Sequence, residues 1–220
     1  MKKVCVCLLM LGMLVLSACS FGEEDLQMVS LEGIENVRID HRSTTVHVES
    51  ADIEELEAAM MYSFGSGIVI DKRKQRVDIR LKSDNMRILK LGKQPRLVVR
   101  VPTDYKGSVT INGNSGNVNV SNLQAQSVDI QGNSGNVSLD YARINSDVNV
   151  SVNSGNVVLN LEDKEPDIRW LLESGSGRRS IALPLNNSRQ SGKKTQGQTG
   201  DGSFQVRIRT TSGSITVKND

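Results

Sequence analysis

A five-residue motif that recurs at a nearly fixed interval constrains the fold of this chain more than any other feature. Asn-Ser-Gly-Asn-Val begins at Asn114, Asn133 and Asn153, which are 19 and 20 residues apart, and a looser copy, Thr-Ser-Gly-Ser-Ile, begins at Thr211. A turn motif with a period of about 20 residues is typical of stacked repeat architectures. The sequence therefore predicts repeats that stack on one another and present an extended surface.

Most of the chain after residue 33 alternates apolar and polar residues. Such alternation is typical of strands with one buried and one solvent-facing side. The segments begin at Val37, Val46, Ile68, Val77, Leu97, Val109, Val118, Val128, Val137, Val148, Val157, Ile168, Ile181, Val206 and Ile215. Because Gly, Asn and Ser separate them as turn residues do, we expect one all-β domain over residues 34–218.

The repeated motif is expected to form a structural turn. Its glycines suit backbone angles that a Cβ atom forbids, and its asparagines tolerate left-handed turns. In a hairpin, the two strands of one repeat would pair across the turn, as in an antiparallel β-sandwich. In a single-stranded β-solenoid, each strand would pair with its equivalent about 20 residues on, and the asparagines would form a ladder. The near-identity of the copies favours the solenoid. The predicted turn residues are Asn114, Gly116, Asn133, Gly135, Asn153, Gly155 and Gly213.

Two segments interrupt the alternation. Asp52–Tyr62 has apolar residues at three-four spacing, which predicts a short helix or an irregular crossing. Residues 186–202 are rich in Ser, Gly, Gln and Lys without an apolar period, which predicts a mobile loop. Trp170 alternates with Ile168 and Leu172, so it is expected in the core.

The first 19 residues indicate secretion and lipidation. Lys2 and Lys3 precede an apolar run that is too short to span a bilayer, and Leu-Ser-Ala then precedes Cys19. This arrangement resembles the lipobox of bacterial lipoproteins, whose cysteine is acylated after cleavage. It implies a signal peptide over residues 1–18, a lipidated tether over residues 19–33, and an anchor on the extracytoplasmic face of the cell membrane. A lipidated Cys19 would leave the mature chain without a disulfide or a cysteine metal site.

The distribution of charge limits the partners. Without the signal peptide, basic and acidic residues balance at 25 each, so no basic excess points to nucleic acid. Residues 19–70 have a net charge of −9 and residues 71–100 one of +8. The two segments either offset each other on neighbouring surfaces, or residues 72–100 form a basic patch for an anionic envelope polymer or lipid headgroups.

Three features resemble the putative-adhesin domain family of bacterial envelope proteins, whose function is unknown. They are Val-Arg-Val-Pro at residues 99–102, the row of Ser-Gly-Asn-Val corners, and the terminal pattern from Gly200 to Ile215. The resemblance covers residues 34–218 and implies a β-helix-like fold with no catalytic residues to carry over. Members often have Asp at the corners where this chain has Asn or Ser, which argues against a metal at the corners.

The candidate chemical groups are sparse. His41 and His47 could form a metal pair or dyad, but alternation places His47 on the solvent-facing side and His41 inward. Asp129 and Asp140 are nearly the only outward acids in the regular repeats, and glycoside chemistry needs paired carboxylates. We therefore expect no enzyme activity, no cofactor and no metal site.

The sequence favours a membrane-anchored, non-catalytic lipoprotein that binds or adheres to an envelope protein or polysaccharide. Two alternatives are an accessory or sensor protein of an envelope-stress system and a β-helix enzyme that acts on polysaccharide.

Overall fold

A computed structural model describes residues 25–61, 67–82 and 95–219. The predicted signal peptide and Cys19 lie outside these ranges, as do residues 83–94 of the basic segment. All regular secondary structure in the described ranges is β-strand, which confirms the all-β prediction. Nowhere in these ranges does a helix of membrane-spanning length and apolarity occur.

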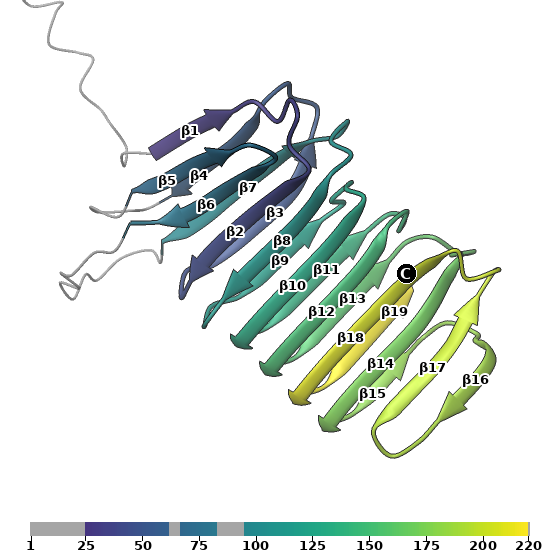
Figure 1. Ribbon diagram of the computed structural model, residues 1–220. Coiled ribbons are helices and arrows are strands. Elements are labelled where there is room, and N and C mark those ends of the chain that lie inside the picture. The colour runs from purple at the N-terminus through teal and green to yellow at the C-terminus, as the bar shows by residue number, and fades with distance from the viewer. Residues whose placement is uncertain (1–24, 62–66, 83–94, 220) are drawn as a thin grey trace, which may run out of the picture.

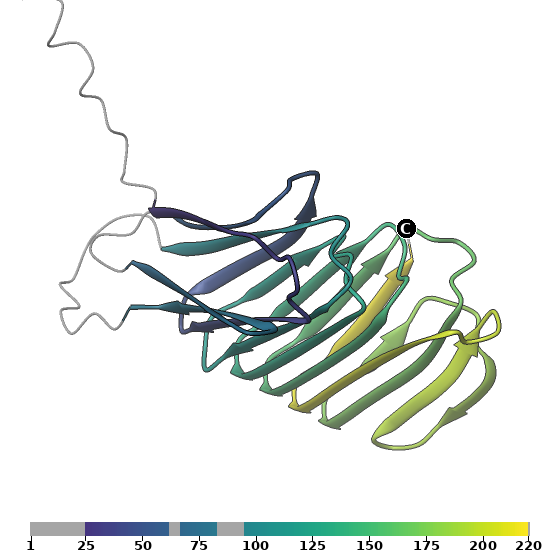
Figure 2. The ribbon, with the colours of Figure 1, turned by 45° about the horizontal axis from the view of Figure 1, so that its top comes forward.

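The strands form two sheets that face each other (Figures 1 and 2). The nine-stranded sheet has the order β1 (Asp25–Val29), β4 (Leu56–Met61), β7 (Arg96–Pro102), β3 (Thr45–Ala51), β9 (Val118–Ser121), β11 (Val137–Tyr141), β13 (Val157–Leu161), β19 (Ile215–Asn219) and β15 (Arg179–Ile181). The ten-stranded sheet has the order β16 (Asn186–Gln190), β17 (Lys194–Thr199), β14 (Ile168–Ser176), β18 (Phe204–Ser212), β12 (Asp147–Ser154), β10 (Ser127–Ser134), β8 (Ser108–Gly113), β2 (Asn36–Arg42), β6 (Arg76–Leu81) and β5 (Ile68–Arg73).

The central repeats pair in parallel and in register. Val128 of β10 lies between Val109 of β8 and Val148 of β12, and Val137 of β11 lies between Val118 of β9 and Val157 of β13. The two strands that flank each motif therefore belong to different sheets. The alternative prediction of a hairpin within one repeat is therefore wrong. The predicted pairing of each central strand with its equivalent in the next repeat is confirmed.

Both sheets are mixed, so the fold departs from a uniform stack of single-stranded coils. β18 lies between β12 and β14, which places the last coil of the chain inside the series. At one end, β1 and β4 run antiparallel to their neighbours, and β5 runs antiparallel to β6. At the other end, β17 pairs antiparallel with both β14 and β16. Regular parallel stacking thus occupies the centre, and antiparallel strands close both ends.

The core lies between the sheets and consists of columns of inward-facing apolar side chains. One column is fully buried: Val77, Val37, Val109, Val128, Val148, Val206 and Trp170. Trp170 is in the core as predicted, and its indole Nε1–H donates to Thr199 Oγ1 at 3.0 Å. Because one face of every central strand is buried, a slip by one residue would expose the whole column.

Three predictions about irregular segments are wrong. The helix over Asp52–Tyr62 is replaced by β4, whose Leu56, Ala58 and Met60 face the core. Residues 186–202 contain β16 and β17, a hairpin that pairs with β14 instead of forming a loop. The tether predicted over residues 19–33 contains β1 from Asp25 onward. In each case, pairing with a neighbouring strand satisfies the hydrogen bonds of the backbone. This tertiary pairing outweighs the weak sequence pattern on which the prediction rested.

Candidate binding surfaces

The tight corners of the repeats stack along one edge of the molecule through a column of glycines. Gly116 and Gly135 have φ angles of 101° and 117°, as expected for the predicted turn. A Cβ atom on Gly135 would lie 2.2 Å from the carbonyl oxygen of Gly116, and one on Gly155 would lie 2.0 Å from that of Gly135. Gly213 continues the column above Gly155, so the looser motif copy is a true fourth corner. The corners require glycine because successive backbones are nearly in contact.

The asparagines of the corners form the predicted ladder. Asn133 Nδ2–H donates to Asn114 Oδ1 at 3.3 Å, and Asn153 Nδ2–H donates to Asn133 Oδ1 at 3.3 Å. A second row uses side-chain oxygens to accept backbone N–H groups, as from Asn156 N to Asn136 Oδ1 at 3.0 Å. The amides therefore bond along the stack, which gives these residues a structural role.

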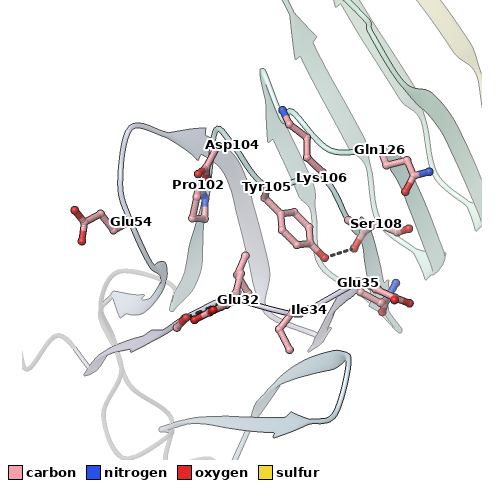
Figure 3. Close-up of a pocket in the computed structure, with 14 residues that line it drawn as sticks. Glu32, Ile34, Glu35, Glu54, Pro102, Asp104, Tyr105, Lys106, Ser108 and Gln126 are labelled. Carbon is pink, nitrogen blue, oxygen red and sulfur yellow. Dashed lines mark hydrogen bonds between the residues drawn. The ribbon is translucent and has the colours of Figure 1, made fainter.

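The opposite edge carries longer loops and several shallow hollows. Three of these loops each place one side chain into the core, Tyr105, Leu123 and Ile144, and the fourth buries Pro166. The hollow of Figure 3, about 750 Å³ in volume, lies between the loop that contains Tyr105 and the segment from Ser30 to Asn36. Tyr105 O–H donates to the Ser108 carbonyl at 3.3 Å, and burial together with the charge of Glu35 raises the pKa of Tyr105 to about 12.

The charges of this hollow are acidic and dispersed. Its lining contains Glu32, Glu35, Glu54 and Asp104 but a single cation, Lys106. In Figure 3, Glu54, Lys106 and Gln126 extend away from one another. The arrangement lacks a nucleophile with an adjacent base, and its charge is unfavourable for an anionic ligand.

The two histidines do not form a site together. His41 lies in β2 of the ten-stranded sheet, and His47 lies in β3 of the nine-stranded sheet. His41 is buried as predicted, its Nδ1–H donates to the Thr44 carbonyl at 2.6 Å, and burial lowers its pKa. His47 is half-buried on the outer face, with its Nε2 3.2 Å from Glu49 Oε2. In the described ranges, no three His, Cys, Asp or Glu side chains are grouped to hold a metal ion.

The carboxylates singled out in the repeats are also separated. Asp129 lies on β10 and accepts from Asn149 Nδ2 at 2.6 Å. Asp140 lies on β11 in the other sheet and accepts from Asn160 Nδ2 at 2.5 Å. Both carboxylates thus bond to asparagines of the next coil, and they cannot act as the two acids of one glycosidase site.

Half of the basic residues that the structure describes in the basic segment, four of eight, pair with nearby acids. Arg80 pairs with Asp71, Arg76 Nη2 lies 3.1 Å from Asp78 Oδ2, and Arg100 bridges Glu49 and Glu57 at 3.2 Å each. Acidic and basic strands therefore offset each other in part here.

A different basic surface lies at the end of the stack formed by β14, β17 and β18. Residues 168–219 contain nine Lys or Arg against two Asp or Glu, a net charge of +7. On the outer face of the ten-stranded sheet, Arg209 and Lys194 lie on either side of Glu173, and Arg207 and Arg169 lie further along β18 and β14. We call the surface formed by these four cations and Glu173 the arginine face. Arg209 donates to Glu173 at 2.6 and 2.9 Å, whereas Arg169 and Arg207 make no hydrogen bond or ion pair with any described residue. The charge of residues 168–219 is a sequence signal for this surface that the predictions above did not use.

One solved structure has a similar architecture. A putative cell adhesion protein from Clostridium sporogenes shares 14% identity over 90% of this chain and 100% of its own, with a TM-score of 0.66. A putative adhesin from Bacteroides fragilis shares 13% identity over 90% of this chain and 97% of its own, with a TM-score of 0.33. At 14% identity, the similarity to the Clostridium sporogenes protein shows the fold alone. No curated protein matched the sequence.

The family follows from the sequence profile. The profile of the Toastrack DUF4097 family matches residues 34–139 and, in a second overlapping match, residues 114–218. Together the matches span the stacked corners and both sheets, and this protein therefore belongs to the Toastrack DUF4097 family.

Proposed function

We propose that this protein is a non-enzymatic, lipid-anchored protein of the cell envelope that binds an anionic polymer through the arginine face. The observation that carries the proposal is the arginine face itself, with four cations against the single acid Glu173 and with Arg169 and Arg207 exposed and unpaired among the described residues. It lies in a segment, residues 168–219, with a net charge of +7. The adhesion role named for the Clostridium sporogenes protein is consistent with binding, but the charge of this chain's own residues supplies the ligand class.

The geometry of the arginine face suits a linear polyanion. Neighbouring strands in a sheet are about 4.8 Å apart, so Arg169 on β14 and Arg207 on β18 present cations at closely spaced positions. Gln205 of β18 lies opposite Arg169 in the strand register, and Gln196 and Gln198 of β17 lie on the same outer face. Guanidinium groups bind phosphate and carboxylate oxygens through paired hydrogen bonds. An anionic envelope polymer could therefore bind along this face without a deep pocket.

The orientation of the stack favours a polymer over the membrane as the ligand. β1 and the strands that carry the arginine face, β14, β17 and β18, lie at opposite ends of the molecule (Figure 1). The lipobox-like segment ending at Cys19 precedes β1, so an anchor there would hold the β1 end near the bilayer and the arginine face away from it. The register of the central repeats further supports the inference that the coils form one continuous solenoid between these two ends.

The ligand class can be tested with the full chain purified in detergent. We expect retention on immobilised poly(glycerol phosphate), on polygalacturonate, or on both, and no retention on neutral dextran. The two polyanions distinguish phosphate from carboxylate recognition. Equal retention on dextran, loss of retention on both polyanions, or a preference for phosphatidylglycerol vesicles would contradict the proposal.

The anchor has its own test. Cys19→Ala should move the protein from the membrane fraction of the cells to the soluble fraction, because no acyl chain can then be attached. Membrane retention of this variant would exclude Cys19 as the anchor.

A further inference from the structure

The outer face of the nine-stranded sheet is apolar at its β1 end. Leu26 lies beside Ala59, which lies beside Val98. Met28 and Met61 flank this row on β1 and β4, opposite Glu57 and Arg96 respectively. We call these five apolar residues the apolar patch. Leu26 and Met28 are 51% and 54% exposed, and among the described residues they are the exposed large hydrophobic side chains.

The orientation of β1 is the reverse of that expected for a surface strand. Its polar side chains point toward β5, where Asp25 Oδ2 accepts from Ile68 N at 2.8 Å and Gln27 Nε2–H donates to Ile68 O at 2.8 Å. A shift by one residue would bury Leu26 and Met28 and expose Asp25 and Gln27. The two hydrogen bonds to Ile68 hold β1 in the observed register, in which Leu26 and Met28 face outward. The exposure of the apolar side chains is thus fixed by the structure of β1.

The position of the patch in the chain indicates what covers it. Cys19 precedes Asp25 by six residues, and an extended chain spans at most about 3.5 Å per residue, or roughly 20 Å here. We propose that the apolar patch lies against the lipid bilayer in which Cys19 is anchored, with Leu26 and Met28 at the boundary between headgroups and acyl chains. This inference rests on the lipid anchor of the proposed function.

The surroundings of the patch fit a bilayer surface. Arg100 beside the patch is paired with both Glu49 and Glu57, so these three groups form a local ion-pair network at the border of the patch. The strands that carry the patch (β1, β4 and β7) and those that carry the arginine face (β14, β17 and β18) belong to different sheets and lie at opposite ends of the molecule (Figures 1 and 2). With the patch on the bilayer, the arginine face would point away from it. Each half-exposed side chain removed from water should strengthen membrane contact roughly ten-fold.

The test uses the full, lipidated chain in phosphatidylcholine vesicles. Apart from Cys5, Cys7 and Cys19, the chain has no cysteine, so Met28→Cys can carry a single environment-sensitive fluorophore. Thr216→Cys, on the outer face of β19 in the same sheet, is the matched control position. We expect lipid-attached quenchers to reduce the emission at position 28 several-fold more than at position 216. Adding Leu26→Ser should weaken the contact between patch and bilayer roughly ten-fold. Quenching at position 28 should fall accordingly.

The outcomes separate the anchor from the patch. If the protein does not remain on the vesicles, the anchor of the proposed function fails. If it remains but position 28 is quenched no more than position 216, the anchor stands and the patch proposal is overturned. A blue-shifted label that lipid quenchers do not reach, together with crosslinked dimers, would assign the patch to a second copy and would also overturn the proposal.

Discussion

The carbonyl oxygen of Gly116 lies 2.2 Å from the point that a Cβ atom on Gly135 would occupy. The same close approach recurs from Gly135 to Gly155 and from Gly155 to Gly213. The corner backbones of successive coils are therefore packed more closely than any side chain at these positions would allow. This relationship explains why the motif keeps its glycine through all four copies.

Gly135→Val should be strongly destabilising. The valine would combine a φ of 117° with a Cβ clash against backbone, and we expect the free energy of unfolding to fall by about 2–5 kcal/mol. Gly132→Ala is the matched control, because the nearest atom to its Cβ is Val152 Cγ2 at 3.8 Å. Urea denaturation should show a change within about 1 kcal/mol for the control. Equal midpoints for both variants would contradict a column of close corners.

A disulfide can report the stacking directly. Asn133 and Asn153 side chains hydrogen-bond at 3.3 Å, and stacked positions in neighbouring strands are about 4.8 Å apart, within the range of a disulfide. Oxidation of Asn133→Cys/Asn153→Cys should give an intramolecular disulfide, which peptide mass spectrometry can map. Asn133→Cys/Thr211→Cys spans two layers, about 10 Å, and should remain reduced. Bridging in the second pair but not in the first would require a different strand order.

His41 should make stability depend on pH. Burial lowers its pKa from 6.5 in the folded chain, although the Thr44 carbonyl and Asp40 act in the opposite direction. The unfolded chain therefore binds a proton more readily, and stability should fall as pH drops from about 6.5 toward the folded pKa. Urea denaturation between pH 8 and pH 5 should show this slope. His41→Asn should remove this pH dependence of stability, whereas His47→Asn should retain it. An unchanged slope in His41→Asn would mean that another group causes the pH dependence.

Tyr141→Phe should stabilise the protein. The Tyr141 hydroxyl is buried with no hydrogen-bond partner among the described residues, and burial raises its pKa. Removing an unsatisfied polar group while keeping the ring should raise the free energy of unfolding by about 1 kcal/mol. Thermal or urea denaturation can measure the difference. A loss of stability would mean that the hydroxyl has a bonding partner.

The sequence contained enough information to predict the centre of the fold. Alternation of β-branched residues specified the inward columns, and the period of the motif specified parallel register between β8, β10 and β12. Gly135 and Asn133 could be assigned to corners because their neighbours 19 or 20 residues away have the same identity. Trp170 and His41 were also placed correctly, since alternation alone decides which side of a strand faces the core.

The ends of the stack could not be predicted in the same way. Ala59 and Met60 of β4 are both buried, one on each face, so the strand lacks the alternation that identifies a half-buried strand. The β16–β17 hairpin buries Thr195 and Thr199 in place of aliphatic residues, so its composition resembles a loop. β1 has its polar side inward, which is visible only once Ile68 is placed beside Asp25 and Gln27.

The arginine face could have been found from the sequence by counting charge over residues 168–219. What the count could not show is which arginines are paired. Glu173 neutralises Arg209 because β14 and β18 place them side by side, whereas Arg169 and Arg207 lie beside Gln205 and Leu171. The free cations depend on register between strands that are far apart in the chain.

The salt dependence of polyanion binding tests the central claim most directly. We would measure the affinity of the full chain in detergent for the better-retained polyanion over a series of salt concentrations. Arg169→Gln/Arg207→Gln should weaken binding and reduce the slope of log K against log salt by about 1.5, as expected for the loss of two anion contacts. Arg38→Gln/Arg42→Gln removes the same charge at the other end of the ten-stranded sheet and should leave both quantities nearly unchanged. Equal effects of the two double variants, or no effect of the first, would contradict binding at the arginine face.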